Sequence, residues 1–277
     1  MPWIWIALCA KACIGIALIA RLLALNLHGV CRVFCIFVLY ESLCSSLILV
    51  QHYLTVPTLN YNLEWLVLMA PSWIMNLWMV YAVLDAVLAR LPGILRFSRK
   101  LLNYTFVAAV VVALITAKPE FAAKANPAYH GWLDLAVSTG QVLERVIATI
   151  VLLEMLAILG FVLWFPIRIP RNLVVFSLGL VFFFFWRNIL MLAEEFLPTE
   201  TGRQWASTAS MLVLAGCFVY WALRLTRAGE SIEVSLGHGW RQGDQKKLLA
   251  QLEAMNASLL RDTGAKRGER SVHVGEN

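Results

Sequence analysis

Four ionisable residues stand inside long apolar runs of this sequence: Lys11, Glu41, Glu154 and Arg187. A charged side chain at the depth of a membrane core is costly unless it is paired, so each of the four is expected to meet a partner or to serve a function. Lys11 and Glu41 lie in consecutive runs, and so do Glu154 and Arg187, which predicts these two pairs. The pairs either lock a helix bundle or line a solvated pocket, proton path or ligand cavity open to the outside.

Further polar residues extend this pattern. The candidate intramembrane polar cluster consists of Lys11, Glu41, Ser45, Glu154, Arg187 and Asn188. Nearer the predicted outer face, the candidate site residues are His52, Glu144 and Glu194. Glu41, Ser45 and His52 recur on one helix face, and His52 is interpreted as an interfacial hydrogen-bonding group or as a ligand or pH switch. Arg145 points away from Glu154 and is predicted to extend to the lipid headgroups. Near the end of the apolar part, Ala206, Ser207 and Ser210 form a small face that allows close helix approach.

Seven apolar segments must position these residues. Of the 277 residues, 60% are hydrophobic and only 14% are charged, whereas soluble domains carry about 25% charged residues. About 20 apolar residues in an α-helix span the ~30 Å hydrocarbon core of a bilayer. The sequence therefore predicts an all-α membrane protein, a seven-transmembrane-helix bundle. Its predicted spans are residues 3–25, 33–52, 65–84, 101–117, 146–165, 173–193 and 204–223.

The distribution of Lys and Arg predicts the orientation, because short cytoplasmic loops carry an excess of these residues. Alternate turns and the start of the tail hold Arg21, Arg32, Arg90, Arg96, Arg99, Lys100, Arg168, Arg171, Arg224 and Arg227. The loops on the other side hold Lys118, Lys124 and Arg203, offset by acidic residues. We therefore expect the N-terminus outside and the C-terminus in the cytoplasm, in a multi-pass protein of the cytoplasmic (inner) membrane.

A polar tail, residues 226–277, follows the predicted membrane domain, residues 1–225. Within it, residues 244–261 are predicted to form one amphipathic helix whose apolar face consists of Leu248, Leu252, Met255 and Leu259. This helix either lies on the bundle or inner leaflet, or serves self-association or a cytoplasmic protein partner. Residues 264–277 are predicted to be disordered.

Several classes of protein are disfavoured by the same sequence. The six cysteines lie in or beside apolar segments without the spacing of a disulfide framework or zinc site, so we expect no metal and no cofactor. The last span has no Lys for a retinal Schiff base, and only two of the five histidines lie near a span, too few for a di-haem cytochrome. Basic residues confined to short loops indicate no nucleic-acid partner. No catalytic motif is present, which disfavours an enzyme.

The first half carries the motifs Leu27-His-Gly-Val-Cys-Arg32, Phe37-Val-Leu-Tyr-Glu41 and Val80-Tyr-Ala-Val-Leu-Asp85. With these motifs, the membrane part resembles a family of uncharacterised seven-helix integral membrane proteins from soil bacteria, and this resemblance implies no activity. The leading functional prediction is a receptor-like, sensory or scaffolding protein whose tail contacts a partner. The alternative is a small-solute or proton-coupled transporter that uses the carboxylates of Glu41 and Glu154. An integral-membrane enzyme is the third and least favoured class.

Overall fold

The computed structural model of the chain describes residues 2–27, 32–54, 61–124, 132–165, 167–196, 199–235 and 242–273. These residues are mostly helical, as the composition predicts. The helices are α1 (Pro2–Ala24), α2 (Arg32–Leu54), α3 (Tyr61–Val87), α4 (Pro92–Lys124), α5 (Trp132–Trp164), α6 (Arg171–Phe196), α7 (Glu200–Arg224), the 3₁₀ helix η2 (Arg227–Glu230) and α8 (Gln242–His273). Two three-residue strands, β1 (Arg168–Pro170) and β2 (Glu233–Ser235), were not expected from the sequence.

Within the described part of the chain, six helices contain a stretch that is long and apolar enough to cross a membrane. These stretches are Trp3–Ala24, Arg32–Leu54, Leu66–Val87, Thr139–Trp164, Arg171–Glu194 and Gln204–Arg224, and they coincide with six of the seven predicted spans. The seventh predicted span, residues 101–117, falls on α4, whose side chains beyond residue 112 lie mostly outside the described part of the chain. The chain thus has the helices of a multi-pass membrane protein.

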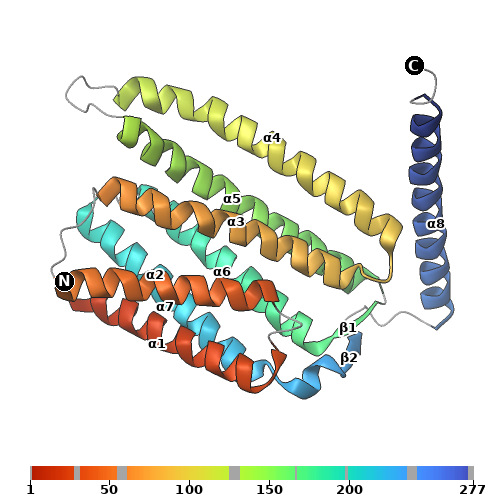
Figure 1. Cartoon of the computed structure of the whole chain (residues 1–277), viewed down its shortest axis with the longest axis horizontal. Coiled ribbons are helices and arrows are strands. Elements are labelled where there is room, and N and C mark those ends of the chain that lie inside the picture. Colours follow the sequence, from red (N-terminus) through yellow and green to blue (C-terminus); the bar gives the residue numbers. More distant parts are fainter. Residues whose placement is uncertain are drawn as a thin grey trace.

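Six helices form a closed ring (Figure 1). Along this ring α1 packs on α2, α2 on α3, α3 on α5, α5 on α6, α6 on α7, and α7 packs back on α1. Helix α4 lies outside the ring against α5 and α3. We call the end of the ring where α1, α3, α5 and α7 begin the N-end, and the opposite end, which carries β1 and β2, the sheet end.

The half of the ring nearer the sheet end is filled by large aromatic side chains. We call this cluster the aromatic floor; it consists of Phe34, Phe37, Phe184, Phe218 and Trp221, each at most 2% exposed. Phe34 meets Trp221 edge to face, with the ring centroids 4.8 Å apart. Three ring helices, α2, α6 and α7, contribute to this cluster, so it joins both sides of the ring.

Gly179 allows the Trp221 indole to fit between α6 and α7. A Cβ atom at position 179 would lie 2.3 Å from Nε1 of Trp221, which is closer than any tolerated contact. The indole itself has 0% exposure, so it has no room to withdraw. Small residues permit this kind of close helix approach in membrane bundles.

A small collar ties together the chain segments at the sheet end. Strand β1, between α5 and α6, pairs antiparallel with β2, which follows α7. The buried Asn172 donates from Nδ2 to the carbonyl oxygen of Thr226 and to Oε1 of Glu230, at 2.8 Å each. Arg90, after α3, forms an ion pair with Glu233 at 2.7 Å. The collar therefore joins the connections that follow α3, α5 and α7.

Helix α4 is attached to α3 by an exposed ion pair. Nη2 of Arg99 lies 2.6 Å from Oδ2 of Asp85, and both side chains are about half exposed. The hydrogen bond to Asp85 and the charge of its carboxylate raise the pKa of the Arg99 guanidinium. Arg99 therefore keeps its positive charge at every physiological pH.

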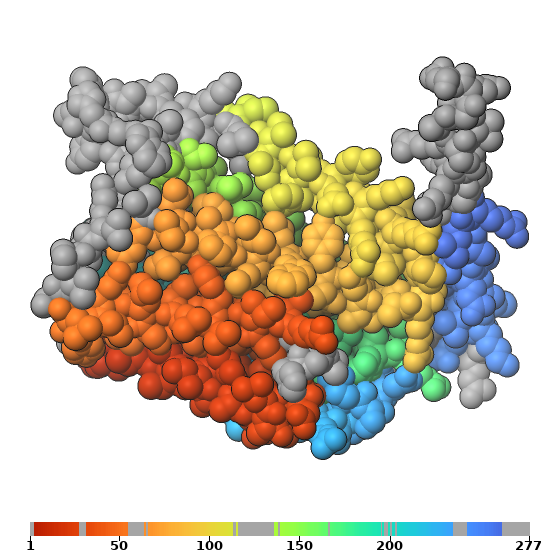
Figure 2. All heavy atoms as spheres, viewed as in Figure 1, coloured from red at the N-terminus to blue at the C-terminus, as the bar shows by residue number. Residues whose placement is uncertain are grey.

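Helix α8 packs across the start of α4 at the sheet end (Figure 2). Oδ1 of Asn256 accepts hydrogen bonds from the backbone N–H groups of Gly93 (2.7 Å) and Ile94 (3.3 Å). These N–H groups are at the N2 and N3 positions of α4, which begins with Pro92. Asn256 therefore caps the N-terminus of α4, as an N-cap side chain usually does. The tail helix is thus attached to the bundle by a capping interaction between distant parts of the sequence.

The tail helix differs from its prediction in length and in its buried face. It begins at Gln242 and continues past Arg261 to His273, so part of the segment expected to be disordered is helical. Leu252 is buried and Leu248 and Leu259 are half-buried, but Met255 is 46% exposed. Asn256 faces the bundle instead of Met255, because the contact with α4 follows i, i+4 spacing and not the predicted heptad.

Replacement of Gly179 by alanine should destabilise the bundle. The added methyl group must displace the Trp221 indole, and overpacking of this kind costs about 1–3 kcal/mol. Gly216→Ala on α7 is the matched control, because no atom lies within 4 Å of the Cβ it would add. Thermal unfolding of both purified variants measures the difference. Equal stability of the two variants would show that α6 and α7 do not meet at Gly179.

Candidate functional site

A polar cavity of about 520 Å³ lies inside the ring, in the half nearer the N-end. All six ring helices contribute to its wall. The lining residues are Lys11, Glu41, Met69, Ser72, Gln141, Glu144, Arg145, Arg187, Leu190, Met191, Glu194, Ser207, Ser210, Met211 and Leu214. Six of these are charged, with three cations and three carboxylates, so the wall has no formal net charge.

Two helices present regular faces to the cavity. On α6 the lining residues recur at positions 187, 190, 191 and 194, and on α7 at positions 207, 210, 211 and 214. This is the i, i+3, i+4, i+7 spacing of one helix face. The cavity therefore extends about 10 Å along α7, given a rise of about 1.5 Å per residue. The same spacing is visible in the sequence and would have identified this face. Ser207 and Ser210, interpreted above as a packing face, line the cavity instead.

The first ion pair joins α1 to α2 at the cavity wall. Nζ of Lys11 lies 2.6 Å from Oε2 of Glu41, and the two side chains are 12% and 15% exposed. This is the pairing predicted from the short connection between the two segments. The pair is held close to the aromatic floor, because Phe37 lies one turn from Glu41 on α2.

The second ion pair joins α5 to α6 on the opposite side of the ring, and here the predicted pairing is wrong. Arg187 donates from Nη2 to Oε1 of Glu144, not to Glu154. Glu144 and Glu154 are ten residues apart, which rotates their side chains by about 80° around the helix. The prediction rested on the two residues lying in consecutive runs, whereas the position of each carboxylate along and around α5 decides which one faces Arg187.

Arg145 also borders the central cavity, with Glu194 and Gln141, and is exposed. Its extension to the lipid headgroups stays a prediction. Glu144 and Arg145 are adjacent on α5 and border the same space, so the wall contributed by this helix carries both charges. Of the three residues assigned to the outer-face site, Glu144 and Glu194 therefore lie in the cavity.

Two residues of the predicted polar cluster bind neighbouring backbone instead of lining the cavity. Ser45 is buried and donates from its hydroxyl to the carbonyl oxygen of Glu41 at 2.8 Å. Asn188 donates from Nδ2 to the carbonyl oxygen of Phe184 at 2.8 Å, and its Oδ1 accepts from the hydroxyl of Thr149 at 2.7 Å. The amide of Asn188 thus joins α6 to α5 and supports the wall from behind.

Glu154 lies apart from the cavity. Its half-buried carboxyl interacts electrostatically with Tyr81 of α3, whose hydroxyl donates to Oδ1 of Asn103 on α4. It is therefore part of the contact region of α3, α4 and α5. This position follows from the rotation around α5 that separates it from Glu144.

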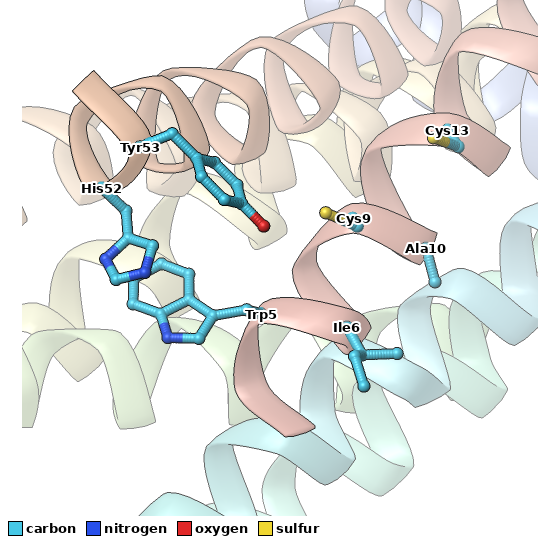
Figure 3. Close-up of a pocket in the computed structure, with 7 residues that line it drawn as sticks. All are labelled: Trp5, Ile6, Cys9, Ala10, Cys13, His52 and Tyr53. Atoms are coloured by element: carbon cyan, nitrogen blue, oxygen red, sulfur yellow. The ribbon is translucent and has the colours of Figure 1, made fainter. Parts of the chain in front are cut away.

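His52 lines a different hollow, a groove between α1 and α2 (Figure 3). The imidazole stacks on the indole of Trp5, with ring centroids 3.5 Å apart and planes inclined by 13°. Ile6, Ala10, two cysteines and Tyr53 complete the mostly apolar lining. His52 was assigned to the outer-face site with Glu144 and Glu194, but it lines this groove while both of those residues line the central cavity.

The cavity has the character of a binding site for a small polar solute. Hydroxyl, amide, carboxylate, ammonium and guanidinium groups converge on it, next to apolar Met and Leu side chains. Towards the sheet end the ring interior becomes apolar at the aromatic floor. Among the described residues, no group of three or more His, Cys, Asp and Glu side chains is placed to hold a metal ion.

Comparison of the chain with protein-family models, with curated proteins and with solved structures gives no match. The function must therefore be inferred from the residues of this chain.

Variants of the second ion pair test which carboxylate Arg187 contacts. Arg187→Gln leaves Glu144 with an uncompensated charge, which should cost about 3 kcal/mol, the low end for a buried pair, because the cavity is polar. Adding Glu144→Gln should recover most of this stability, whereas adding Glu154→Gln should not. Thermal unfolding of the single and double variants provides the measurement. If stability is instead recovered by adding Glu154→Gln and not by adding Glu144→Gln, Arg187 pairs with Glu154, as predicted from the sequence.

Proposed function

We propose that the chain is a receptor-like membrane protein. A small polar solute binds in the cavity from the outside, and the C-terminal tail contacts a partner in the cytoplasm. The observation that carries this proposal is the cavity itself, which six helices line with balanced charges, while the buried aromatic floor fills the ring nearer the sheet end. Such a site can hold a solute without offering it a polar route to the other side.

The proposed orientation rests on the basic residues. A group of basic residues lies at the sheet end. They are Arg21 at the end of α1, Arg32 at the start of α2, and Arg90, Arg96, Arg99, Lys100, Arg168, Arg171, Arg224 and Arg227. An excess of Lys and Arg favours the cytoplasmic side. The cavity at the N-end would then face the outside, and α8 would lie in the cytoplasm.

The collar offers a physical connection between cavity and tail. Helices α6 and α7 carry cavity residues in one half and enter the collar in the other, where Asn172 bonds to Thr226 and Glu230. Strand β2 follows in the chain, and α8 comes after it. A solute that changes the packing of α6 against α7 would shift the population of docked and released α8, as in any two-state receptor.

A cavity-filling variant tests whether the cavity binds a solute. Ser210→Trp should abolish the increase in melting temperature that a bound solute gives to the purified protein, because the indole occupies the cavity. Leu212→Trp is the matched control on the same helix, since Leu212 is 52% exposed on the outer surface. A broad panel of small polar solutes is screened against the wild type and both variants. If no solute distinguishes Ser210→Trp from Leu212→Trp, the cavity is not a binding site.

The tail is tested through the cap that it provides. Asn256→Ala removes the acceptor for two N–H groups of α4 and should weaken the docking of α8 by about 1 kcal/mol. Hydrogen exchange of the α8 backbone should then become faster. Ser258→Ala is the control, because its exposed hydroxyl bonds only within α8, to the carbonyl of Met255. Equal exchange in both variants would show that the cap does not hold the tail.

Glu154 gives one specific reason to consider a proton-coupled carrier as the second function. It is a carboxyl group in the middle of a membrane-length helix, and it lies outside both ion pairs of the cavity. A carrier requires flux of the solute into protein-containing vesicles, and Glu154→Gln should abolish that flux while leaving solute binding intact. Binding without flux in the wild type would favour the receptor.

A further inference from the structure

We propose that the cavity binds a zwitterion of the amino-acid type that carries an apolar side group. This inference rests on the proposed function, because it names the chemical class of the solute that the cavity holds. It follows from three properties of the wall: its balance of charge, the placement of its two ion pairs, and the nature of its apolar residues.

The balance of charge disfavours a solute with a net charge. Lys11, Arg145 and Arg187 are matched by three carboxylates at the same cavity. The side chains of the two ion pairs are only 12–20% exposed, so water screens them weakly. A single added charge would leave the cavity with a net charge, and an uncompensated net charge in a poorly solvated site is strongly unfavourable. A solute whose own charges cancel preserves the balance.

The placement of the ion pairs favours a solute with two separated, opposite charges. One pair joins α1 to α2 and the other joins α5 to α6, and the ring order places α3 between them on one side and α7 on the other. Each pair is a contact to one carboxylate oxygen, which leaves the ammonium, guanidinium and carboxylate groups with further bonding capacity. An ammonium group can therefore approach one carboxylate while a carboxylate group approaches the cation of the opposite wall.

The remaining wall favours an apolar side group over a sugar. Met69, Met191, Met211, Leu190 and Leu214 supply apolar surface beside the charges. Unbranched, polarisable methionines adapt to the shape of an apolar group. None of the described residues that line the cavity is aromatic, so the flat surface on which a sugar ring commonly stacks is missing from this wall.

Four probes of related structure test the inference on the full-length protein in lipid nanodiscs. L-Norleucine is the zwitterion, hexanoate lacks its ammonium group, pentylamine lacks its carboxylate, and mannitol is an uncharged polyol. Isothermal titration should show norleucine binding at least about tenfold more tightly than each of the other three, which corresponds to about 1.4 kcal/mol. The double variant Lys11→Met with Glu41→Gln removes one charged wall while keeping the net charge unchanged, and it should abolish this preference.

A second double variant controls for general effects of removing an ion pair. Asp85→Asn with Arg99→Gln removes the exposed pair at the sheet end and should leave the preference for norleucine intact. Equal or tighter binding of hexanoate, pentylamine or mannitol would overturn the zwitterion and leave the cavity as a site for another solute. Binding of none of the four probes would also overturn it. The proposed function is tested by a different experiment. It is overturned if the panel of small polar solutes contains none whose binding Ser210→Trp abolishes.

Discussion

Charged side chains inside apolar helices must find partners, and this requirement organises the bundle. Lys11 and Glu41 bind each other across α1 and α2, and Arg187 and Glu144 do so across α5 and α6. Because each pair needs its two helices at a fixed depth and rotation, the pairs restrict how the ring can assemble. The polar cavity is the space that remains when both pairs are satisfied at once. The cavity therefore exists because the helices carry these charged residues, which a bundle of purely apolar helices lacks.

The two halves of the ring have different physical character. Towards the N-end, charged and hydroxyl groups surround a space of about 520 Å³, whereas towards the sheet end Trp221 and four phenylalanines pack with at most 2% of each residue exposed. Dense aromatic packing resists small displacements, because its contacts are lost when a gap of even a fraction of an ångström opens. In the proposed receptor, the solute occupies the polar half, and the aromatic half carries the resulting movement of α6 and α7 to the collar.

The positions of the apolar helices could be predicted from the sequence, because length and composition alone determine them. The partner of Arg187 could not, since Glu144 and Glu154 lie on the same helix, about 15 Å apart along its axis and about 80° apart around it, and the packing of α5 against α6 decides which of them Arg187 meets. Ser45 and Asn188 were assigned to the site by their type, but their hydrogen bonds to the backbone depend on local geometry. The collar and the cap from Asn256 join residues far apart in the sequence, for which no local pattern exists.

The contact between α1 and α7 has a consequence for biogenesis. Of the six ring helices, the first to be synthesised is the neighbour of the last, so the ring stays open until synthesis of α7 is complete. Lys11 and Glu41 can meet as soon as α1 and α2 are inserted, which neutralises their charges early. The cavity, by contrast, lacks one complete wall until α7 is in place, because four of its lining residues, Ser207, Ser210, Met211 and Leu214, belong to that helix. Its charged groups all lie on the other helices and are therefore brought together before the wall that closes the ring beside them.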